Sequence, residues 1–294
     1  MLIRDRLSQC ALSDGERAVA EYILKQGTAI RAMTIKEIAD ASFSSPSTLL
    51  RIAHKMDFQG WIELKEAYLR EEEYLNAHFS GIDANLPFQK KDSAMTIAAK
   101  IAALKKEAID DTLSLITDRQ LNAAAAMLEK ASSIGIYASG ENLVICRDFQ
   151  LNMTKIGRKV TLCGLQGEIA YMAYQAEPSS CALIISYSGE TPIPIQAAKI
   201  LKKHQVPIVL ITSLGDNSLT RIADCTLRLC TREKLYSKIA PFSSDISAEY
   251  LLDVLYSCIF SADYDENLRR KIQSAREIEH SVRKSTVEGI REDL

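Results

Sequence analysis

The sequence predicts two domains of different classes: an all-helical N-terminal domain, and an α/β C-terminal domain with a mostly parallel sheet flanked by helices. Up to about residue 77, apolar residues recur at helical spacing and capping residues precede the runs. From residue 134 onwards, strand-like apolar runs alternate with helical runs, which is the pattern of βαβ units. The length of 294 residues and the hydrophobic content of 47% supply enough apolar material for two cores.

Bulk composition argues against several classes of protein. The formal net charge is −2, so no strong overall field attracts polyanions or a membrane surface. No apolar run approaches the roughly 18 residues that a membrane span needs, and charged residues interrupt the N-terminal MLIRDRLSQC, which lacks the pattern of a signal peptide. Seven cysteines occur without CxxC pairs, and no Cys/His cluster has metal-ligand spacing. We therefore expect a cytoplasmic protein with reduced thiols, no metal site, no cofactor and no membrane partner.

The first domain is expected to span residues 1–77. Thr34 with Glu37 three residues later forms a capping-box pattern, and Pro46 suits the first turn of a helix. The helical segments predicted from such signals are residues 13–27, 34–42, 45–56 and 60–75. Residues 78–93 lose periodicity and gather Gly, Pro, Asn and charges, so they are predicted to form a linker.

Residues 34–56 have the proportions of a helix-turn-helix motif, with Phe43 and Ser44 in the turn and Ser45 as the cap of the second helix. Leu49, Ile52 and Ala53 are expected to face inward. The residues expected on the exposed face, where they could reach phosphates or base edges of DNA, are Ser47, Thr48, Arg51 and Lys55. Residues 1–76 hold ten basic and twelve acidic residues, so a basic-domain signature is absent and a solvated helical hairpin stays an alternative.

The second domain, residues 94–294, begins with a long helix from about Ala94 and continues with residues 118–132. The expected strands are residues 134–139, 159–163, 181–186, 207–213 and 225–230. The expected helices between and after them are residues 143–157, 168–176, 193–204, 218–223, 246–260 and 265–284. The helix at 246–260 is apolar on more than one side, so we expect it to be buried in the core or between subunits.

A group of hydroxyl residues follows one buried strand in this domain. Ser186, Ser188, Gly189 and Thr191 lie between the strand ALIIS and the helix that starts near Pro192. In an open parallel sheet, ligands lie beyond the carboxyl ends of strands and next to helix N-termini. Three hydroxyls, a turn-forming glycine and free helix N–H groups are what a phosphate needs. Simple helix capping is the alternative. The loop is not a Walker A loop, because no lysine follows the glycine.

Residues 185–224, beginning ISYSGETPIPIQ, resemble the core of a sugar isomerase (SIS) domain, whose phosphate loop usually reads Ser-x-Ser-Gly-x-Thr. The first turn of that family usually reads Gly-x-Gly-x-Ser, and this chain has residues 138–142, ASGEN, there. The resemblance covers roughly residues 110–260 and implies the SIS fold and a bound phosphosugar. It places the effector contacts at Asn142, Ser186, Ser188, Gly189 and Thr191, with Ser139 and Glu141 as possible further contacts.

Residues 33–65, beginning MTIKEIADASF, are similar to the DNA-binding segment of the RpiR family of bacterial transcriptional regulators, including Ser45, Ser47, Thr48 and Arg51. The family usually has glycine where Asp57 stands, which suggests a slightly altered helix end. The resemblance implies a regulator of sugar or amino-sugar metabolism that binds double-stranded operator DNA as a homodimer or homotetramer. A phosphosugar effector in the SIS domain would modulate this binding.

The alternative function is that of an SIS-type sugar-phosphate isomerase or a related phosphosugar enzyme. Such an enzyme needs an acid/base pair beside a carbonyl. The candidate groups are Glu141, Glu168, Glu190, Glu249 and His204. An isomerase has no need of a helix-turn-helix motif, so we prefer the regulator and assign no catalytic residue. Trp61, Cys146 and Cys163 are expected to be packing residues, and residues 70–74, REEEY, to form a solvated face.

Overall fold

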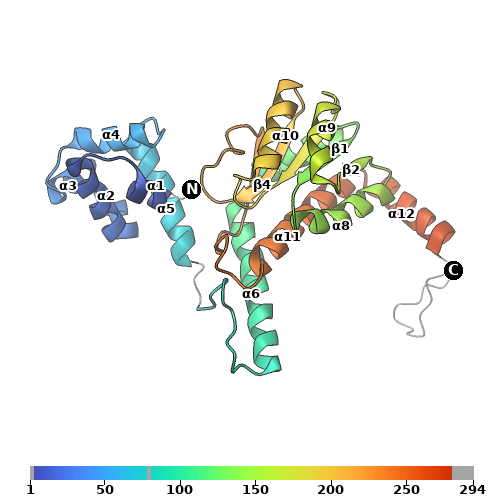
Figure 1. The fold of residues 1–294 in the computed structure, drawn as a ribbon, viewed down its shortest axis with the longest axis horizontal. Helices are drawn as coiled ribbons and strands as arrows, with labels where there is room; N and C mark the ends of the chain where they lie inside the picture. The colour runs from blue at the N-terminus through green and yellow to red at the C-terminus, as the bar shows by residue number, and fades with distance from the viewer. Residues whose placement is uncertain (1–2, 78–80, 280–294) are drawn as a thin grey trace. The chain divides into compact units, whose positions relative to one another are not determined.

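The computed structural model describes residues 3–77 and 81–279 of the chain. These residues divide into two compact units, one formed by residues up to 107 with 214–217 and the other by the rest, so the division falls within helix α6 (Ala94–Leu115). Each unit has its own arrangement of elements (Figure 1). Among the described residues, no helix combines the length and the apolar character that crossing a bilayer requires.

The N-terminal unit contains the helices predicted from its capping signals. Its elements up to residue 77 are α1 (Ile3–Gln9), α2 (Asp14–Gln26), the 3-10 helix η1 (Gly27–Ala32), α3 (Ile35–Ala41), α4 (Pro46–Lys55) and α5 (Trp61–Ala77). Thr34 caps α3, because its Oγ1 accepts a 3.2 Å hydrogen bond from Glu37 N while Glu37 Oε2 accepts one of 2.7 Å from Thr34 N. Trp61 is 5% exposed in the apolar core that these helices share, as expected.

The prediction of a solvated face at residues 70–74 was wrong for two of its glutamates. Glu71 and Glu72 are buried. Glu71 accepts hydrogen bonds from Ile3 N at 2.6 Å and Arg4 N at 2.9 Å, so it satisfies N–H groups at the start of α1. Glu72 lies 3.6 Å from the Arg4 guanidinium. These partners are more than sixty positions away along the chain, which local charge patterning does not reveal.

The second unit is built on a five-stranded parallel sheet with the order β2-β1-β3-β4-β5. The strands are β1 (Ile134–Ala138), β2 (Val160–Leu162), β3 (Cys181–Ile185), β4 (Ile208–Ser213) and β5 (Cys225–Leu229). The helices after α6 are α7 (Asp118–Lys130), α8 (Asn142–Lys155), α9 (Ile169–Tyr174), α10 (Pro192–Lys203), α11 (Phe242–Ala262) and α12 (Tyr264–Glu279); the short 3-10 helix η2 (Gln166–Glu168) precedes α9. The predicted α/β class, with a mostly parallel sheet, is confirmed.

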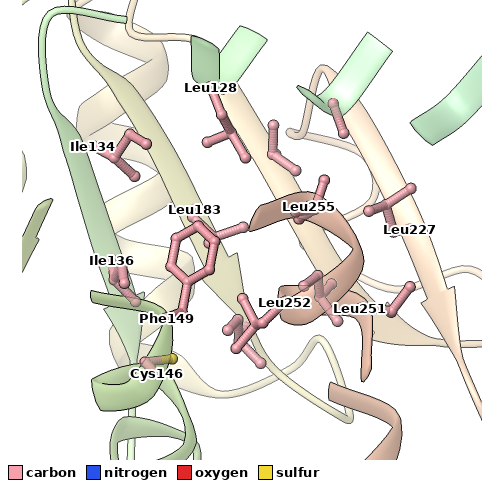
Figure 2. Close-up of a cluster of buried hydrophobic side chains, with 14 of the residues drawn as sticks. Leu128, Ile134, Ile136, Cys146, Phe149, Leu183, Leu227, Leu251, Leu252 and Leu255 are labelled. Carbon is pink, nitrogen blue, oxygen red and sulfur yellow. The ribbon is translucent and has the colours of Figure 1, made fainter. Parts of the chain in front are cut away.

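Two apolar cores cover the two faces of the sheet. On one face, α7, α8 and α11 pack against the strands; there Phe149 of α8 and Leu252 of α11 lie near Leu183 of the central strand (Figure 2). On the other face, α9 and α10 pack against the alternate strand residues, such as Ala182 and Ile184 of β3. Every residue of β3 is buried, as expected for a parallel strand covered on both sides.

Two expected helices differ from the structure by more than two residues, and the end of a third is not described. Residues 218–223 form turns instead of a helix, because Ile222 N and Ala223 N both bond back to Leu219 O within a segment too short for further turns. Helix α11 begins at Phe242, four residues before the expected start, and its buried side faces the sheet while Glu249 and Asp253 are exposed. The last five residues of the predicted 265–284 helix lie outside the described residues.

Candidate functional site

The order of the strands brings the two motif loops together at one edge of the sheet. β2 lies on one side of β1 and β3 on the other, so the chain reverses its direction of winding between β1 and β3. Ala138 pairs with Ile185 at the carboxyl ends of these two strands. The loops that follow, residues 139–141 and 186–191, therefore start side by side. A switch point of this kind is where open α/β sheets bind their ligands.

The loop after β3 is a compact hydroxyl-lined turn. Ser186 is 2% exposed, and its Oγ lies 3.2 Å from Thr191 Oγ1. Glu190 N donates a 3.2 Å hydrogen bond to Ser188 Oγ. Gly189 has φ +67°, a left-handed conformation that favours glycine. The four residues that match the family motif thus lie within one short turn at the switch point.

Thr191 occupies the N-cap position of α10, but its side chain makes no capping hydrogen bond. Pro192 fills the first helical position, where a missing N–H costs nothing. Capping therefore does not explain the threonine at this position. The N-terminal end of α10, with its partial positive charge, adjoins the Ser186 and Thr191 hydroxyls, which is the arrangement that binds an anion such as phosphate.

The Glu190 carboxylate is bonded to Ser218 and does not take part in the hydroxyl cluster. It accepts hydrogen bonds from Ser218 N at 2.8 Å and Ser218 Oγ at 2.6 Å, and Leu219 N donates to Gly189 O at 3.2 Å. The acid thus joins the loop to the segment after β4. It sets the shape of the loop instead of contributing a negative charge to the phosphate position.

Tyr187 connects the same loop to the segment before α11. Its hydroxyl donates to Glu233 O at 2.8 Å and accepts from Glu233 N at 3.0 Å, and burial raises the pKa of its phenol. The buried Glu233 carboxylate in turn accepts from Ser243 N at 2.5 Å and Ser244 Oγ at 2.7 Å at the N-terminus of α11. Lys238 Nζ lies 2.9 Å from Glu233 and 5.3 Å from the centre of the Tyr187 ring.

Sequence reasoning missed Tyr187, Glu233 and Lys238. The position of Tyr187 inside the matched motif was a usable signal. Glu233 and Lys238 lie in an irregular loop that follows β5, and no local pattern singles them out.

The turn after β1 supplies the facing side of the switch point. Gly140 has φ +61° and is exposed with Glu141, while Ser139 and Asn142 are partly buried. Asn142 is the first residue of α8, so its amide stands at a second helix N-terminus on the same edge. An asparagine amide can both donate and accept hydrogen bonds, so Asn142 can bind a sugar hydroxyl or a phosphate oxygen.

Of the candidate acid/base groups of an isomerase, Glu141, Glu168 and Glu190 lie in segments that follow strands at this edge, whereas Glu249 and His204 lie elsewhere. Glu249 lies on α11 and is exposed, and Glu190 is engaged by Ser218. His204 lies at the C-cap of α10, the end opposite the phosphate loop, where its ring contacts Tyr174 edge-on. Glu168 accepts a 3.4 Å contact from the Cys163 thiol after β2. Nowhere in the described part of the chain do three His, Cys, Asp or Glu side chains gather closely enough to hold a metal ion.

The exposed face of α4 differs in part from the predicted one. Ser47 and Arg51 are exposed as expected, but Thr48 is only 4% exposed, which corrects its predicted place on that face. Its Oγ1 lies 3.1 Å from Ser45 Oγ and accepts a 3.2 Å hydrogen bond from Arg51 Nη2. Bonded in this way, a small hydroxyl can be buried at little cost. The missed exposed residues are Leu50 and His54, which continue the stripe at helical spacing.

The other two predicted contacts of α4 have partners. Ser45 holds the N-cap position, but its Oγ contacts the hydroxyls of Ser47 and Thr48 instead of a backbone N–H. Lys55 Nζ lies 2.6 Å from the carboxylate of Glu16 on α2.

A non-glycine residue with positive φ lies on each side of α4 in the chain. Phe43, in the turn before α4, has φ +51° and is fully exposed. Asp57, just after α4, has φ +65°, which explains why glycine suits this position, and it accepts a 3.1 Å hydrogen bond from Arg6. The short turn thus presents an exposed aromatic ring beside the N-terminus of α4.

Both parts of the chain match known families. Residues 2–72 match the helix-turn-helix domain of the rpiR family, and residues 127–256 match the SIS domain. An uncharacterized HTH-type transcriptional regulator of Caldanaerobacter subterraneus is 24% identical over 259 residues, covering 88% of this chain and 90% of the relative. The uncharacterized regulator YbbH of Bacillus subtilis is 24% identical over 271 residues, covering 90% and 94%.

Solved structures agree on the fold. The Vibrio vulnificus NanR protein, solved in complex with ManNAc-6P, superposes with a TM-score of 0.61 at 21% identity, covering 96% of this chain and 100% of NanR. The sugar isomerase domain of an RpiR transcription factor from Sphaerobacter thermophilus gives a TM-score of 0.55 at 15% identity, covering 61% and 98%. With an rpiR-type helix-turn-helix domain followed by a SIS domain, the chain belongs to the RpiR family of transcriptional regulators.

Proposed function

We propose that this protein is a DNA-binding regulator of sugar or amino-sugar metabolism whose operator affinity is modulated by a phosphosugar held at the β1–β3 switch point. The observation that carries the proposal is the hydroxyl-lined loop of residues 186–191 at that point, in a chain that also has a helix-turn-helix domain. The HTH-type relatives and the ManNAc-6P bound by NanR support it. A regulator of this kind works in the cytoplasm, and we assign it no catalytic activity.

The phosphate of the effector is proposed to accept hydrogen bonds from Ser186, Ser188 and Thr191 and from backbone N–H groups around Gly189. Asn142, with Ser139 and Glu141, would contact the sugar from the β1 turn. Glu141 suits sugar hydroxyls, because a carboxylate accepts hydrogen bonds from them and repels a phosphate.

Thermal-shift titration with a panel of hexose, pentose and amino-sugar phosphates tests the effector site. A phosphosugar that stabilises the wild type should lose its effect in a Ser188→Ala, Thr191→Ala double variant. The matched control is Ser132→Ala, Ser179→Ala, which removes two hydroxyls 3.0 Å apart at the opposite, amino edge of β1 and β3. Equal stabilisation of both double variants would place the phosphate elsewhere.

A DNA-binding assay on the region upstream of the coding sequence tests the other half. Ser45, Ser47, Leu50, Arg51 and His54 are proposed to face the major groove, whereas Lys55, the other predicted contact, is paired with Glu16. If Arg51 contacts a base edge, Arg51→Ala weakens operator binding by about 1–3 kcal/mol. Arg17→Ala, which removes an exposed arginine of α2, is the control. Turnover of phosphosugars by the purified protein, without DNA binding, would favour the isomerase instead.

A further inference from the structure

Glu16 occupies an unusual position beneath the proposed recognition helix. Its side chain is 3% exposed, and it lies in the first turn of α2. Its Oε2 accepts a 2.8 Å hydrogen bond from Ser13 N, which completes the capping box of α2. The same oxygen lies 2.6 Å from Lys55 Nζ, and Oε1 lies 3.9 Å from Arg51 Nε. One buried carboxylate therefore faces both cations of α4.

The cap itself does not require those cations. Glu37 caps α3 through the same capping-box pattern with Thr34, yet Glu37 is exposed and has no ion pair with α4 among the described contacts. A glutamine can replace glutamate in a capping box. The charge of Glu16 is therefore not needed for the helix start, whereas its position holds Lys55 in place.

The pairing changes the charge that α4 presents to DNA. Lys55 Nζ also donates to Ala11 O at 3.4 Å, so its ammonium is held toward the α1–α2 turn. Arg51, whose side chain is 63% exposed, keeps most of its guanidinium free for a partner and is steered by both Glu16 and Thr48. Glu16, Arg51 and Lys55 together carry one net positive charge, so one cation of α4 is neutralised by the protein itself.

We infer that Glu16 is a positioning residue of the DNA interface, which orients Arg51 and withholds Lys55 from the phosphate backbone. This inference rests on the proposed DNA-binding function. Contacts with phosphates provide affinity that is independent of base sequence, whereas base contacts provide specificity. Glu16 limits the phosphate contacts of Lys55 and orients Arg51 for a base contact. It therefore raises the ratio of operator to non-operator affinity.

The test measures affinity of the full-length protein for an operator fragment and for a random duplex by fluorescence anisotropy between 50 and 200 mM salt. The variants are Glu16→Gln, the matched capping-box control Glu37→Gln, and the double variant Glu16→Gln, Lys55→Gln. In Glu16→Gln, one or two freed cations should steepen the slope of log affinity against log salt by about 0.9 each. Each freed cation then adds about a threefold loss of affinity over this salt range.

Binding of the random duplex at 50 mM salt should become tighter in Glu16→Gln, and the ratio of operator to random affinity should fall. Glu37→Gln should keep the wild-type slope, and removing Lys55 as well should restore most of it. A slope for Glu16→Gln equal to that of Glu37→Gln overturns the inference, with circular dichroism verifying that each variant is folded. If the wild type binds no DNA at any salt concentration, the proposed function falls and the inference falls with it.

Discussion

At the scale of single residues, carboxylates make several of the contacts between elements of the N-terminal unit. The hydrogen bond from Lys55, followed by the one from Ser13 N, holds the pKa of Glu16 at about 2, well below its ordinary value of 4.5. A group whose pKa is lowered by folding stabilises the folded state while it is ionised. Glu16 thus links the stability of this unit to pH through the same contacts that position α4.

We predict that this stabilisation is complete above about pH 4.5 and is lost as pH falls toward about 2, because the unfolded chain takes up the proton first. The loss is on the order of 3 kcal/mol. Urea unfolding followed by the fluorescence of Trp61 measures it, since Trp61 is the one tryptophan of the chain and is buried in this unit. The wild-type curve should fall more steeply with acid than that of Glu16→Gln; parallel curves would contradict the assignment.

Thr48 shows where reasoning from the sequence ends at this scale. Its neighbours Leu49, Ile52 and Ala53 were predicted to face inward and do so. Thr48 lies at the border between the apolar and polar stripes of α4, where periodicity does not decide. Thr48 can be buried because its Oγ1 has hydrogen-bond partners in the Ser45 hydroxyl and the Arg51 guanidinium.

At the scale of elements, α11 depends on a side chain from outside the helix. Glu233 precedes α11 by nine residues and accepts hydrogen bonds from the N–H groups of Ser243 and Ser244. A carboxylate at a helix N-terminus satisfies free donors and interacts favourably with the helix dipole. The loop of residues 230–241 is therefore attached at its Glu233 end to the helix that covers one face of the sheet.

We predict that Glu233→Ala destabilises the second unit by about 3 kcal/mol, because buried donors and Lys238 lose their partner. The control is Glu249→Ala, which removes an exposed carboxylate from α11 and should change the free energy of unfolding by less than about 0.5 kcal/mol. Chemical unfolding followed by circular dichroism at 222 nm compares the two. Equal stabilities would show that water replaces the cap.

The elements themselves were largely predictable, because each strand is a short apolar run and most helices have amphipathic periodicity. The failures have a common cause. Residues 218–223 contain three apolar residues, but Leu219 packs into the core from a turn, and Asp224 ends the segment by accepting a 2.9 Å hydrogen bond from Ile208 N. Glu71 and Glu233 likewise find their partners through tertiary contacts that a local pattern does not contain.

At the scale of the whole molecule, apolar side chains remain exposed on α8 and α12. Val144 and Leu151, seven residues apart on α8, are 75% and 52% exposed, and Leu268 and Ile272 of α12 are 37% and 42% exposed. Contiguous exposed apolar surface marks interaction sites. A single helix-turn-helix motif binds DNA weakly, whereas a dimer presents two recognition helices to a pseudo-palindromic site.

We therefore predict that the protein is a homodimer or homotetramer and that Leu151→Asp lowers its mass toward that of the monomer, because association would bury the new charge. Leu165→Asp, at another exposed apolar residue, is the control and should keep the wild-type mass. Light scattering at micromolar concentration gives the masses. A monomeric wild type would contradict the prediction, as would an unchanged mass of Leu151→Asp.

The effector can change operator affinity only through a difference in its own affinity for two arrangements of the protein, and a coupling of about 1–3 kcal/mol gives a 5–150-fold effect. Tyr187 is the side chain that joins the phosphate loop to Glu233 and so to α11. Arg232, the residue before Glu233, forms a buried ion pair with Asp111 of α6, the helix that begins at Ala94, with Nη2 3.1 Å from Oδ1. The phosphate loop is therefore connected to α6 through the Tyr187–Glu233 hydrogen bonds and the Arg232–Asp111 ion pair, and a shift of the loop can be transmitted along these contacts.

We predict that Tyr187→Phe keeps effector affinity within about threefold but reduces the coupling, because the phenol ring stays packed while its hydroxyl no longer holds residue 233. The control is Tyr137→Phe, a change in β1 that removes a buried hydroxyl. This hydroxyl donates a 3.4 Å hydrogen bond to Met172 O, and the variant should keep wild-type coupling. Operator affinity measured with and without phosphosugar, and phosphosugar affinity measured with and without operator, must change by one common factor. If that factor is the same in Tyr187→Phe and the wild type, the effect of the effector does not pass through Tyr187.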